Sequence, residues 1–354
     1  MILIFTFYFY LYFISFITPE CSGTKLVDDE VIGHICSWNY RFDKNKNHFN
    51  LAWPDKNAVY FGMIIPFGSS NMTIQSNEFF DHSIINVPRH PIASYFSIQI
   101  YTLGDMITSE YHMNDAEILS LDGLTKLDTR YKLNFVFNEY KSHFALFRIY
   151  DSYVNDYWAG LQPSTYVDNV RLANCKIDYK QQQNLYTDIN IGDFCNVNDK
   201  FHFIEVPPGT LTNYDANYMI ACIEPNVTYN IEINVPQLFC SMGYDQDDTH
   251  PHVDEKYDMR YASLSILSTN APRPTIDSYA FSCNETTYKT QIIVTDNVPM
   301  PGLLYRQILP NPSFEYSIAN AKHKCYNPYD SDNKYDVVCI EKNMKNYFPK
   351  IWRV

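Results

Sequence analysis

The chain lacks the short motifs that mark the best-known catalytic and metal sites. None of its nine cysteines has a C-x-x-C spacing, which excludes a zinc ribbon and a thioredoxin-like redox centre. Neither G-x-S-x-G nor H-E-x-x-H occurs, so the common serine-hydrolase and zinc-protease arrangements are excluded as well. The sequence predicts no cofactor, and its 40 acidic residues make any single catalytic carboxylate pair arbitrary. No residue is therefore assigned as catalytic.

Glycine and basic residues are also scarce. Only 11 of the 354 residues are glycine, whereas 30 are tyrosine and 23 are phenylalanine. Aromatic side chains favour half-buried strands over helices. With 27 basic against 40 acidic residues, the formal net charge is −13, which repels phosphate backbones and anionic lipids. The composition predicts a mainly β protein and excludes nucleic acid as a partner.

The N-terminus carries no charge in its first 18 residues, and Pro19 with the small residues after it ends this apolar run. These features predict a signal peptide over residues 1–23, with cleavage after Gly23 and secretion of the rest. Because the run is longer than an average signal-peptide core and no Lys or Arg precedes it, the alternative is an uncleaved membrane anchor. A membrane is expected as a partner only in that alternative.

The other cysteines and three sequons are typical of an exported protein. Removal of Cys21 with the signal peptide leaves eight cysteines, an even number that predicts disulfides in a secreted chain and leaves their pairing open. Asn71, Asn226 and Asn284 begin N-x-T sequons and are predicted glycosylation sites. The predicted disulfide cysteines are Cys36, Cys175, Cys195, Cys222, Cys240, Cys283, Cys325 and Cys339.

One strand-like segment occurs twice in the sequence in similar form. "YKLNFVF", Tyr131–Phe137, recurs as "YKTQIIV", Tyr288–Val294, 157 residues later, and apolar residues occupy every second position in both. This is the period of a strand with one buried face. Four further pairs recur in the same order: "AVYFGMII" from Ala58 and "ANYMIACI" from Ala216, "NMTIQ" from Asn71 and "NVTYN" from Asn226, "YFSIQIY" from Tyr95 and "YASLSIL" from Tyr261, and "FALFRIY" from Phe144 and "GLLYRQI" from Gly302.

Each repeated unit is longer than 90 residues and contains several alternating runs, so it is a domain and not a solenoid repeat. Loops with Pro and Asn separate the runs, which favours two sheets packed face to face. We expect two tandem related antiparallel β-sandwich, jelly-roll-like domains, with Asn71 and Asn226 at corresponding turns. The predicted segments are a signal peptide (1–23), a first sandwich (24–177), a linker (178–198), a second sandwich (199–320) and a C-terminal extension (321–354).

The segments "LAWPDKNAVYFGM", "PIASYFSIQIYTLGD", "FRIYDSYVNDYWAGLQP", "DMRYASLSI" and "LLYRQILPNPSFEYSI" carry a family resemblance. The chain resembles uncharacterised exported proteins that are similar to two bacterial domains of unknown function, numbered twelve-fourteen and twelve-fifty-four. The resemblance extends from Trp53 to Ile318 and implies tandem β-sandwiches without an established activity. An Arg is usual before the Tyr-Phe-Ser strand; this chain has Ser94 there and keeps the Arg as Arg260 in the second half.

Three groups of residues are candidate binding sites, each with a structural alternative. Arg148 and Arg306 lie within strand runs, where a cation needs a polar ligand or, more simply, a neighbouring Asp. Tyr157 and Trp158 form either a platform for a sugar ring or packing under a loop. Five residues form either a divalent-cation site or a solvated acidic loop: Asp247, Asp248, His250, His252 and Asp254.

These observations favour a secreted, glycosylated binding or surface-interaction protein whose partner is a carbohydrate or another extracellular protein. The alternative is an extracellular hydrolase, with a carbohydrate-active enzyme the most natural variant on this kind of fold. A cleft with two facing carboxylates would favour the hydrolase. A shallow aromatic or polar face would favour the binding protein.

Overall fold

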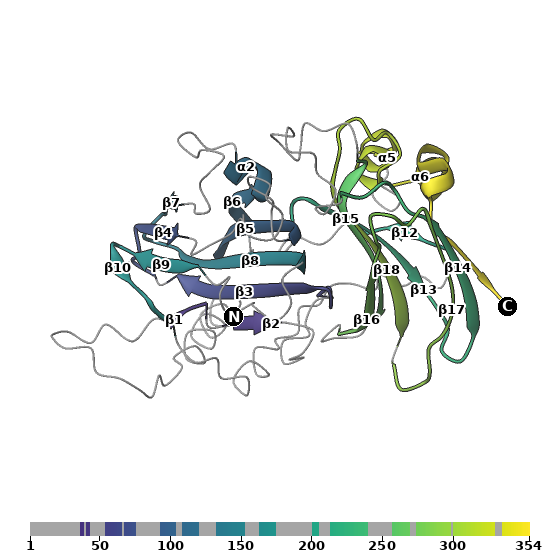
Figure 1. Ribbon diagram of the computed structural model, residues 1–354, viewed down its shortest axis with the longest axis horizontal. Coiled ribbons are helices and arrows are strands. Elements are labelled where there is room, and N and C mark those ends of the chain that lie inside the picture. The colour runs from purple at the N-terminus through teal and green to yellow at the C-terminus, as the bar shows by residue number, and fades with distance from the viewer. Residues whose placement is uncertain are drawn as a thin grey trace.

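The computed structural model shows two β-sandwiches, one from each half of the chain (Figure 1). The predicted signal peptide and the predicted linker lie outside the described residues. These are 36–38, 40–42, 54–65, 67–75, 93–103, 108–119, 132–152, 163–174, 200–204, 213–239, 257–269, 274–298, 300–329 and 335–354.

The first sandwich pairs a five-stranded sheet, ordered β2-β3-β8-β5-β6, with a four-stranded sheet, ordered β10-β9-β4-β7. Neighbouring strands within both sheets are antiparallel, and β1 and β11 form a separate parallel pair. The elements are β1 (Cys36–Ser37), β2 (Tyr40–Phe42), β3 (Ala58–Ile65), β4 (Asn71–Gln75), β5 (Ala93–Leu103), β6 (Thr108–Asn114), α2 (Asp115–Leu119), β7 (Lys132–Val136), β8 (Ser142–Ser152), β9 (Ser164–Val167), β10 (Val170–Arg171) and β11 (Ala173–Asn174).

The second sandwich pairs a five-stranded sheet, ordered β12-β13-β18-β15-β16, with a three-stranded sheet, ordered β17-β14-β19. Two helices lie between its last two strands, and Ser317 and Asp336 cap their N-termini. The elements are β12 (His202–Phe203), β13 (Ala216–Cys222), β14 (Thr228–Asn234), β15 (Met259–Ser268), β16 (Thr275–Ala280), β17 (Thr287–Ile293), β18 (Pro301–Pro310), α5 (Ile318–Cys325), α6 (Val337–Met344), η3 (Lys345–Tyr347) and β19 (Lys350–Arg353).

Each sandwich has its own core because alternate residues of both its sheets point inward. In the first core, Phe147 of β8 packs against the rings of Phe61 and Phe96, at centroid distances of 6.2 and 6.0 Å. Tyr305 of β18 occupies the corresponding place in the second core and is fully buried. The predicted period-2 pattern therefore matches the buried face in both halves.

The two halves have the same strand order, and the prediction of two related β-sandwiches is confirmed. β2-β3-β8-β5-β6 corresponds to β12-β13-β18-β15-β16, and β9-β4-β7 corresponds to β19-β14-β17. The pairing register corrects one detail. Asn71 pairs with Val136 and Thr228 pairs with Ile293, so the counterpart of Asn71 is Thr228. Asn226 lies two residues earlier, and the expected correspondence of the two sequons is wrong.

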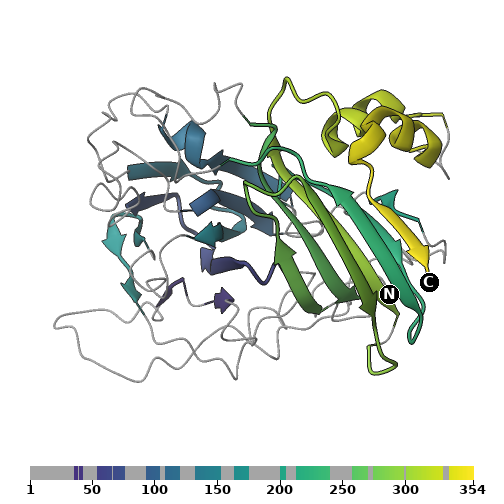
Figure 2. The ribbon, with the colours of Figure 1, turned by 45° about the vertical axis from the view of Figure 1, so that its right-hand side comes forward.

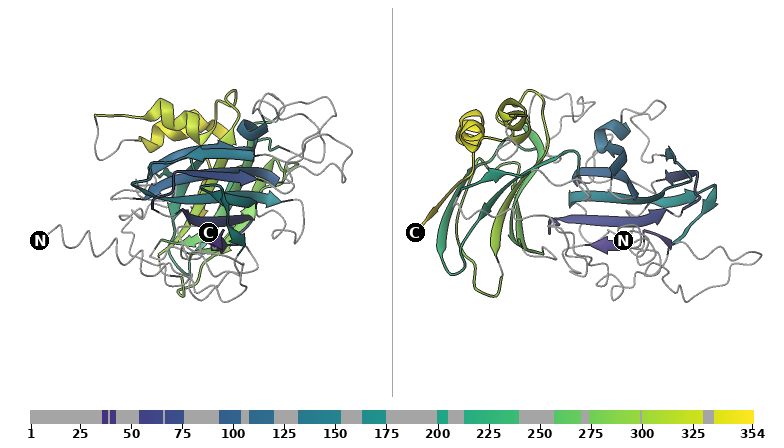
Figure 3. Two further views of the ribbon diagram at one scale, coloured as in Figure 1. Left: turned by 90° about the vertical axis from the view of Figure 1, so that its left-hand side faces the viewer. Right: turned by 180° about the vertical axis from the view of Figure 1, so that it is seen from behind.

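The predicted C-terminal extension is also wrong, because residues 350–353 complete the second sandwich. β19 pairs antiparallel with β14 through Ile351 and Ile231, as β9 pairs with β4 in the first half. The strand lies at the edge of the second sandwich, beyond α5 and α6 (Figures 2 and 3). Sequence comparison missed it because "KIWR" of β19 and "STYV" of β9 share no residue.

A disulfide joins the two C-terminal helices, between Cys325 of α5 and Cys339 of α6, with an S–S distance of 2.05 Å. Cys222 and Cys283 are also disulfide-bonded. The side chains of the other four predicted cysteines lie outside the described part of the chain: Cys36, Cys175, Cys195 and Cys240. No helix among the described residues is long and apolar enough to span a membrane.

Candidate functional site

Buried aromatic and charged side chains fill the contact between the two sandwiches, which we call the interdomain layer. β5 of the first five-stranded sheet lies against β15 of the second (Figure 1). Tyr150 and Tyr261 meet there with ring centroids 5.1 Å apart. Five residues form the apolar part of the layer and are at most 2% exposed: Ala58, Tyr95, Tyr150, Tyr261 and Ile308.

Asp55 of the first half is held by three side chains of the second. Its Oδ2 accepts hydrogen bonds from Tyr261 at 2.9 Å and Ser263 at 2.6 Å, and it forms an ion pair with Arg306. Asp55 and Arg306 are both buried. Because a buried charge is costly without a partner, this contact ties the two sandwiches together.

Asp215 of the second half is held by side chains of the first in the same way. Its Oδ2 accepts a hydrogen bond from Tyr95 at 2.7 Å and lies 3.0 Å from His112 Nε2 and 3.4 Å from Asn114 Nδ2. Burial alone would raise the pKa of Asp215, but the contacts with His112, Tyr95 and Asn114 hold it below its ordinary value. Asp215 therefore stays ionised at neutral pH.

One hydrogen bond across the interdomain layer is made twice, once in each direction. Asp55 accepts a hydrogen bond from Tyr261, and its counterpart Asn213 accepts one at 3.2 Å from Tyr95, the counterpart of Tyr261. The backbone carbonyls of Asp55 and Asn213 each accept at 3.1 Å from the first amide of the next strand, β3 or β13. This reciprocity is the signature of an isologous interface, here formed by two halves of one chain.

Arg260 contacts the residue that is equivalent to it in the other half of the chain. Its Nε donates to the carbonyl oxygen of Ser94 at 2.9 Å, and Ser94 is the residue that corresponds to Arg260 in the first half. Its Nη2 pairs with Asp115 of α2, and its guanidinium lies 4.3 Å from the ring centroid of Phe239. A second Arg at position 94 would bring two guanidinium groups together near this local two-fold axis.

The candidate ligand residues Arg148 and Arg306 occupy corresponding sites. Arg148 pairs in register with Tyr60 and Ser97, and Arg306 with their counterparts. Arg306 is bound to Asp55, as the structural alternative predicts. Arg148 donates to Gln99 Oε1 at 2.8 Å and to the Tyr101 hydroxyl. Both guanidiniums thus make contacts inside the protein.

The other two candidate binding sites fall in parts of the chain that the structure does not describe. Tyr157 and Trp158 lie outside the described residues, and so does the proposed cation cluster of Asp247, Asp248, His250, His252 and Asp254. Within the described ranges, no group of three or more His, Cys, Asp or Glu is placed to hold a metal. Asn71, Asn226 and Asn284 are described; the first is half-buried and the other two are exposed.

A feature that sequence reasoning missed is a row of side chains repeated on the outer faces of the sandwiches. We define the first outer face as the solvent side of β9-β4-β7 and the second outer face as that of β19-β14-β17. On each face, an aromatic residue of β9 or β19 lies beside a polar residue of the central strand, β4 or β14, and that residue lies beside an amide of β7 or β17. The rows are Tyr166–Thr73–Asn134 and Trp352–Asn230–Gln291.

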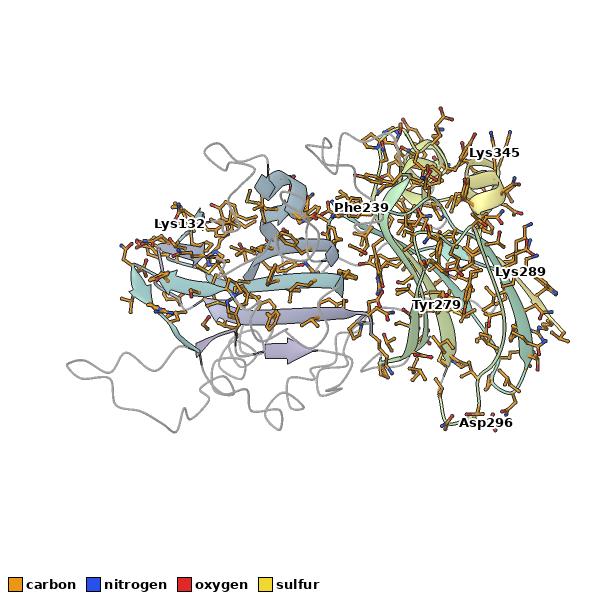
Figure 4. The ribbon with its side chains drawn as sticks, in the orientation of Figure 1. Lys132, Phe239, Tyr279, Lys289, Asp296 and Lys345 are labelled. Carbon is orange, nitrogen blue, oxygen red and sulfur yellow. A yellow bond between two sulfur atoms is a disulfide. The ribbon has the colours of Figure 1, made fainter. Side chains whose placement is uncertain are left out.

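Hydrogen bonds order both rows. Thr73 Oγ1 donates to Asn134 at 2.8 Å, and Gln291 Nε2 donates to Asn230 Oδ1 at 3.2 Å. Trp352 is 44% exposed, although tryptophan side chains are highly buried on average. The corresponding lysines Lys132 and Lys289, from β7 and β17, lie at opposite ends of the molecule (Figure 4). The two faces are therefore separate copies of one arrangement.

The interdomain carboxylates predict a two-phase dependence of stability on pH. Burial raises the pKa of Asp115 to about 6, against the lowering effect of Arg260, so this residue adds stability as the pH falls from about 6 toward 4. The pKa of Asp215 is depressed, so its contribution is present above about pH 4 and is lost below. In denaturant unfolding at pH 7, 5 and 3, Asp115→Asn should remove the rise and Asp215→Asn should reduce the fall. Unchanged profiles in both variants would contradict this assignment.

Comparisons with known proteins add little to this geometry. No protein-family model and no curated protein matches the sequence, so the resemblance to the domains numbered twelve-fourteen and twelve-fifty-four stays a prediction. A solved structure of an uncharacterised protein from Burkholderia cenocepacia is similar over 74% of this chain and 75% of that chain, with a TM-score of 0.48 and 7% sequence identity. At that level the likeness supports no conclusion about function.

Proposed function

We propose that the chain is a secreted, N-glycosylated carbohydrate-binding protein, and that the second outer face is its binding surface. The observation that carries this proposal is the exposed Trp352 in one row with Asn230 and Gln291. The apolar N-terminus, the cysteines and the sequons support export.

The chemistry of the face suits a neutral saccharide. An indole offers a rigid apolar surface on which the C–H side of a sugar ring stacks. The amides of Asn230 and Gln291 each supply donors and an acceptor, which is what a pair of sugar hydroxyls needs. Lys289 and Glu232, paired at 3.1 Å in the adjacent row, neutralise each other. Lys350 of β19 stands opposite Glu232 in the same row, so the face combines one aromatic platform with fixed polar groups and one lysine beyond the Lys289–Glu232 pair.

Truncation of the platform tests the proposal. In calorimetric titrations of the full secreted protein with chito-, cello- and manno-tetraose, we expect at least one to bind. Trp352→Ala should weaken that binding by about 2 kcal/mol, roughly 30-fold in Kd, because a central aromatic anchor commonly carries this much. Trp352→Phe keeps a ring and should lose much less.

Tyr329→Ala is the matched control, because Tyr329 is a fully solvated aromatic, 96% exposed, outside the face. It should bind as wild type. Equal binding by Trp352→Ala and wild type would contradict the proposal. Release of new reducing ends from the tetraoses would favour the hydrolase instead.

A further inference from the structure

The sequon at Asn71 lies on the first outer face. In β4, Asn71, Thr73 and Gln75 point outward, while Met72 and Ile74 are fully buried. An N-x-T sequon on a strand necessarily puts its Asn and Thr on one face. Thr73 belongs to the row with Tyr166, so a glycan on Asn71 would start one row away from that aromatic ring.

The second sandwich lacks this arrangement. The counterpart of Asn71 is Thr228, and the sequon residue Asn226 lies in the preceding turn with a φ of 60°. Asn226 is exposed, and its Nδ2 bonds to Asp296 of the facing turn. Asp296 lies at the end of the second sandwich (Figure 4). A glycan on Asn226 would therefore leave from the end of the sandwich and not from its outer face.

We infer that an N-glycan on Asn71 folds onto the first outer face, with its core N-acetylglucosamine residues against Tyr166. This closes the first outer face, and the matching second outer face stays open. That the first outer face accommodates a saccharide rests on the proposed function of the second outer face, because the two faces carry equivalent rows of side chains. The contact of the chain's own glycan with Tyr166 does not depend on binding of any external ligand.

The distances suit this contact. Tyr166 is one strand across and two residues along from Asn71, which is roughly 8 Å between Cα atoms at ordinary sheet spacings. One or two sugar residues span that length. Asn71 Nδ2 donates to Asp168 Oδ1 and to Ser70 Oγ, both at 3.1 Å. A glycosylated amide keeps one hydrogen, so one of these bonds persists and orients the first sugar along the face.

The test compares enzymatic trimming of the two glycans on the native, secreted protein. With an endoglycosidase that cuts the chitobiose core, and mass spectrometry of glycopeptides, the Asn71 glycan should be removed at least ~10-fold more slowly than the Asn226 glycan, which equals ~1.4 kcal/mol of protection. Tyr166→Ala should remove most of this protection, whereas Tyr166→Phe keeps the ring and should retain it. Equal trimming rates, or an unmodified Asn71, would overturn the inference.

Binding stoichiometry separates this inference from the proposed function. With the tetraose that binds best, wild type should bind one equivalent and Asn71→Gln two, while Asn226→Gln should still bind one. Two equivalents on wild type, or one on Asn71→Gln, would overturn closure of the first outer face. If no variant binds but the trimming difference persists, the proposed function fails and the docked glycan stands.

Discussion

Replacement of Asp55 by Ala should cost about 3–5 kcal/mol of unfolding free energy, because it leaves the buried guanidinium of Arg306 without its carboxylate. The hydroxyls of Tyr261 and Ser263 lose the same acceptor. Asp55→Asn keeps an acceptor but not the charge and should recover only part of the loss. Urea or guanidinium unfolding of the purified protein at pH 7 measures the effect.

The matched control is Asn213→Ala, the corresponding site in the other half. Its partner Tyr95 also donates to Asp215, and no charge is exposed by the change, so the expected cost is about 1 kcal/mol. Similar losses of unfolding free energy in Asp55→Ala and Asn213→Ala would show that the Asp55–Arg306 ion pair adds no stability beyond that of a neutral hydrogen bond.

Phe147→Ala should destabilise the first sandwich by about 3–5 kcal/mol, the usual cost of removing a buried phenyl ring. The ring is fully buried and packs against Trp38, Phe61 and Phe96 from both sides of its strand. Because the interdomain layer joins the halves, we expect both sandwiches to unfold in a single transition, and Phe147→Ala should shift this transition to lower temperature. Thermal unfolding followed by tyrosine fluorescence and circular dichroism tests this.

Tyr140→Ala is its control, since Tyr140 lies in the turn before β8 and is 75% exposed. It should change the unfolding free energy by less than about 0.5 kcal/mol. Two separate transitions in Phe147→Ala, with only the first displaced, would mean that the sandwiches unfold independently.

The duplication could be predicted from sequence because strand registers survive divergence. A slip of one residue would turn Phe135 and Ile292 toward water, so the period-2 pattern is retained even where the side chains differ. The sequence also identified Arg148 and Arg306 as candidate site residues, because each is a charged residue within an otherwise apolar strand. The pairing of Arg306 with an Asp followed from the cost of a buried cation, although which Asp it binds did not.

The interdomain layer and the outer rows could not be predicted, because their partners come from segments without a shared pattern. Asp55 is a loop residue that precedes β3, and nothing local distinguishes it from 39 other acidic residues. Trp352 joins Asn230 only through β19, which shares no sequence with β9. The sequence wrongly predicted that Asn71 and Asn226 are equivalent, because "NMTIQ" and "NVTYN" are similar. The pairing register of the sheets shows that Thr228 is the equivalent residue.

The contacts of Arg260 give a physical reason for a small residue at position 94. Near a two-fold axis, a residue contacts its own counterpart. One Arg fits, because Arg260 uses the Ser94 carbonyl and Asp115 as acceptors. A second would add like charge beside the buried guanidinium of Arg260, which already holds Asp115. We expect the chain to tolerate an Arg at one of the two positions and not at both.

A double-mutant cycle between Asp55 and Arg306 tests most directly whether the two halves are joined through this ion pair. The variants are Asp55→Ala, Arg306→Met and the double substitution, each unfolded by urea at pH 7. If the pair forms across the halves, the double variant should be more stable than the sum of the single losses predicts, with a coupling of about 2 kcal/mol or more. Losses that add within about 0.5 kcal/mol would show that the two residues do not interact, and the joined architecture would be contradicted.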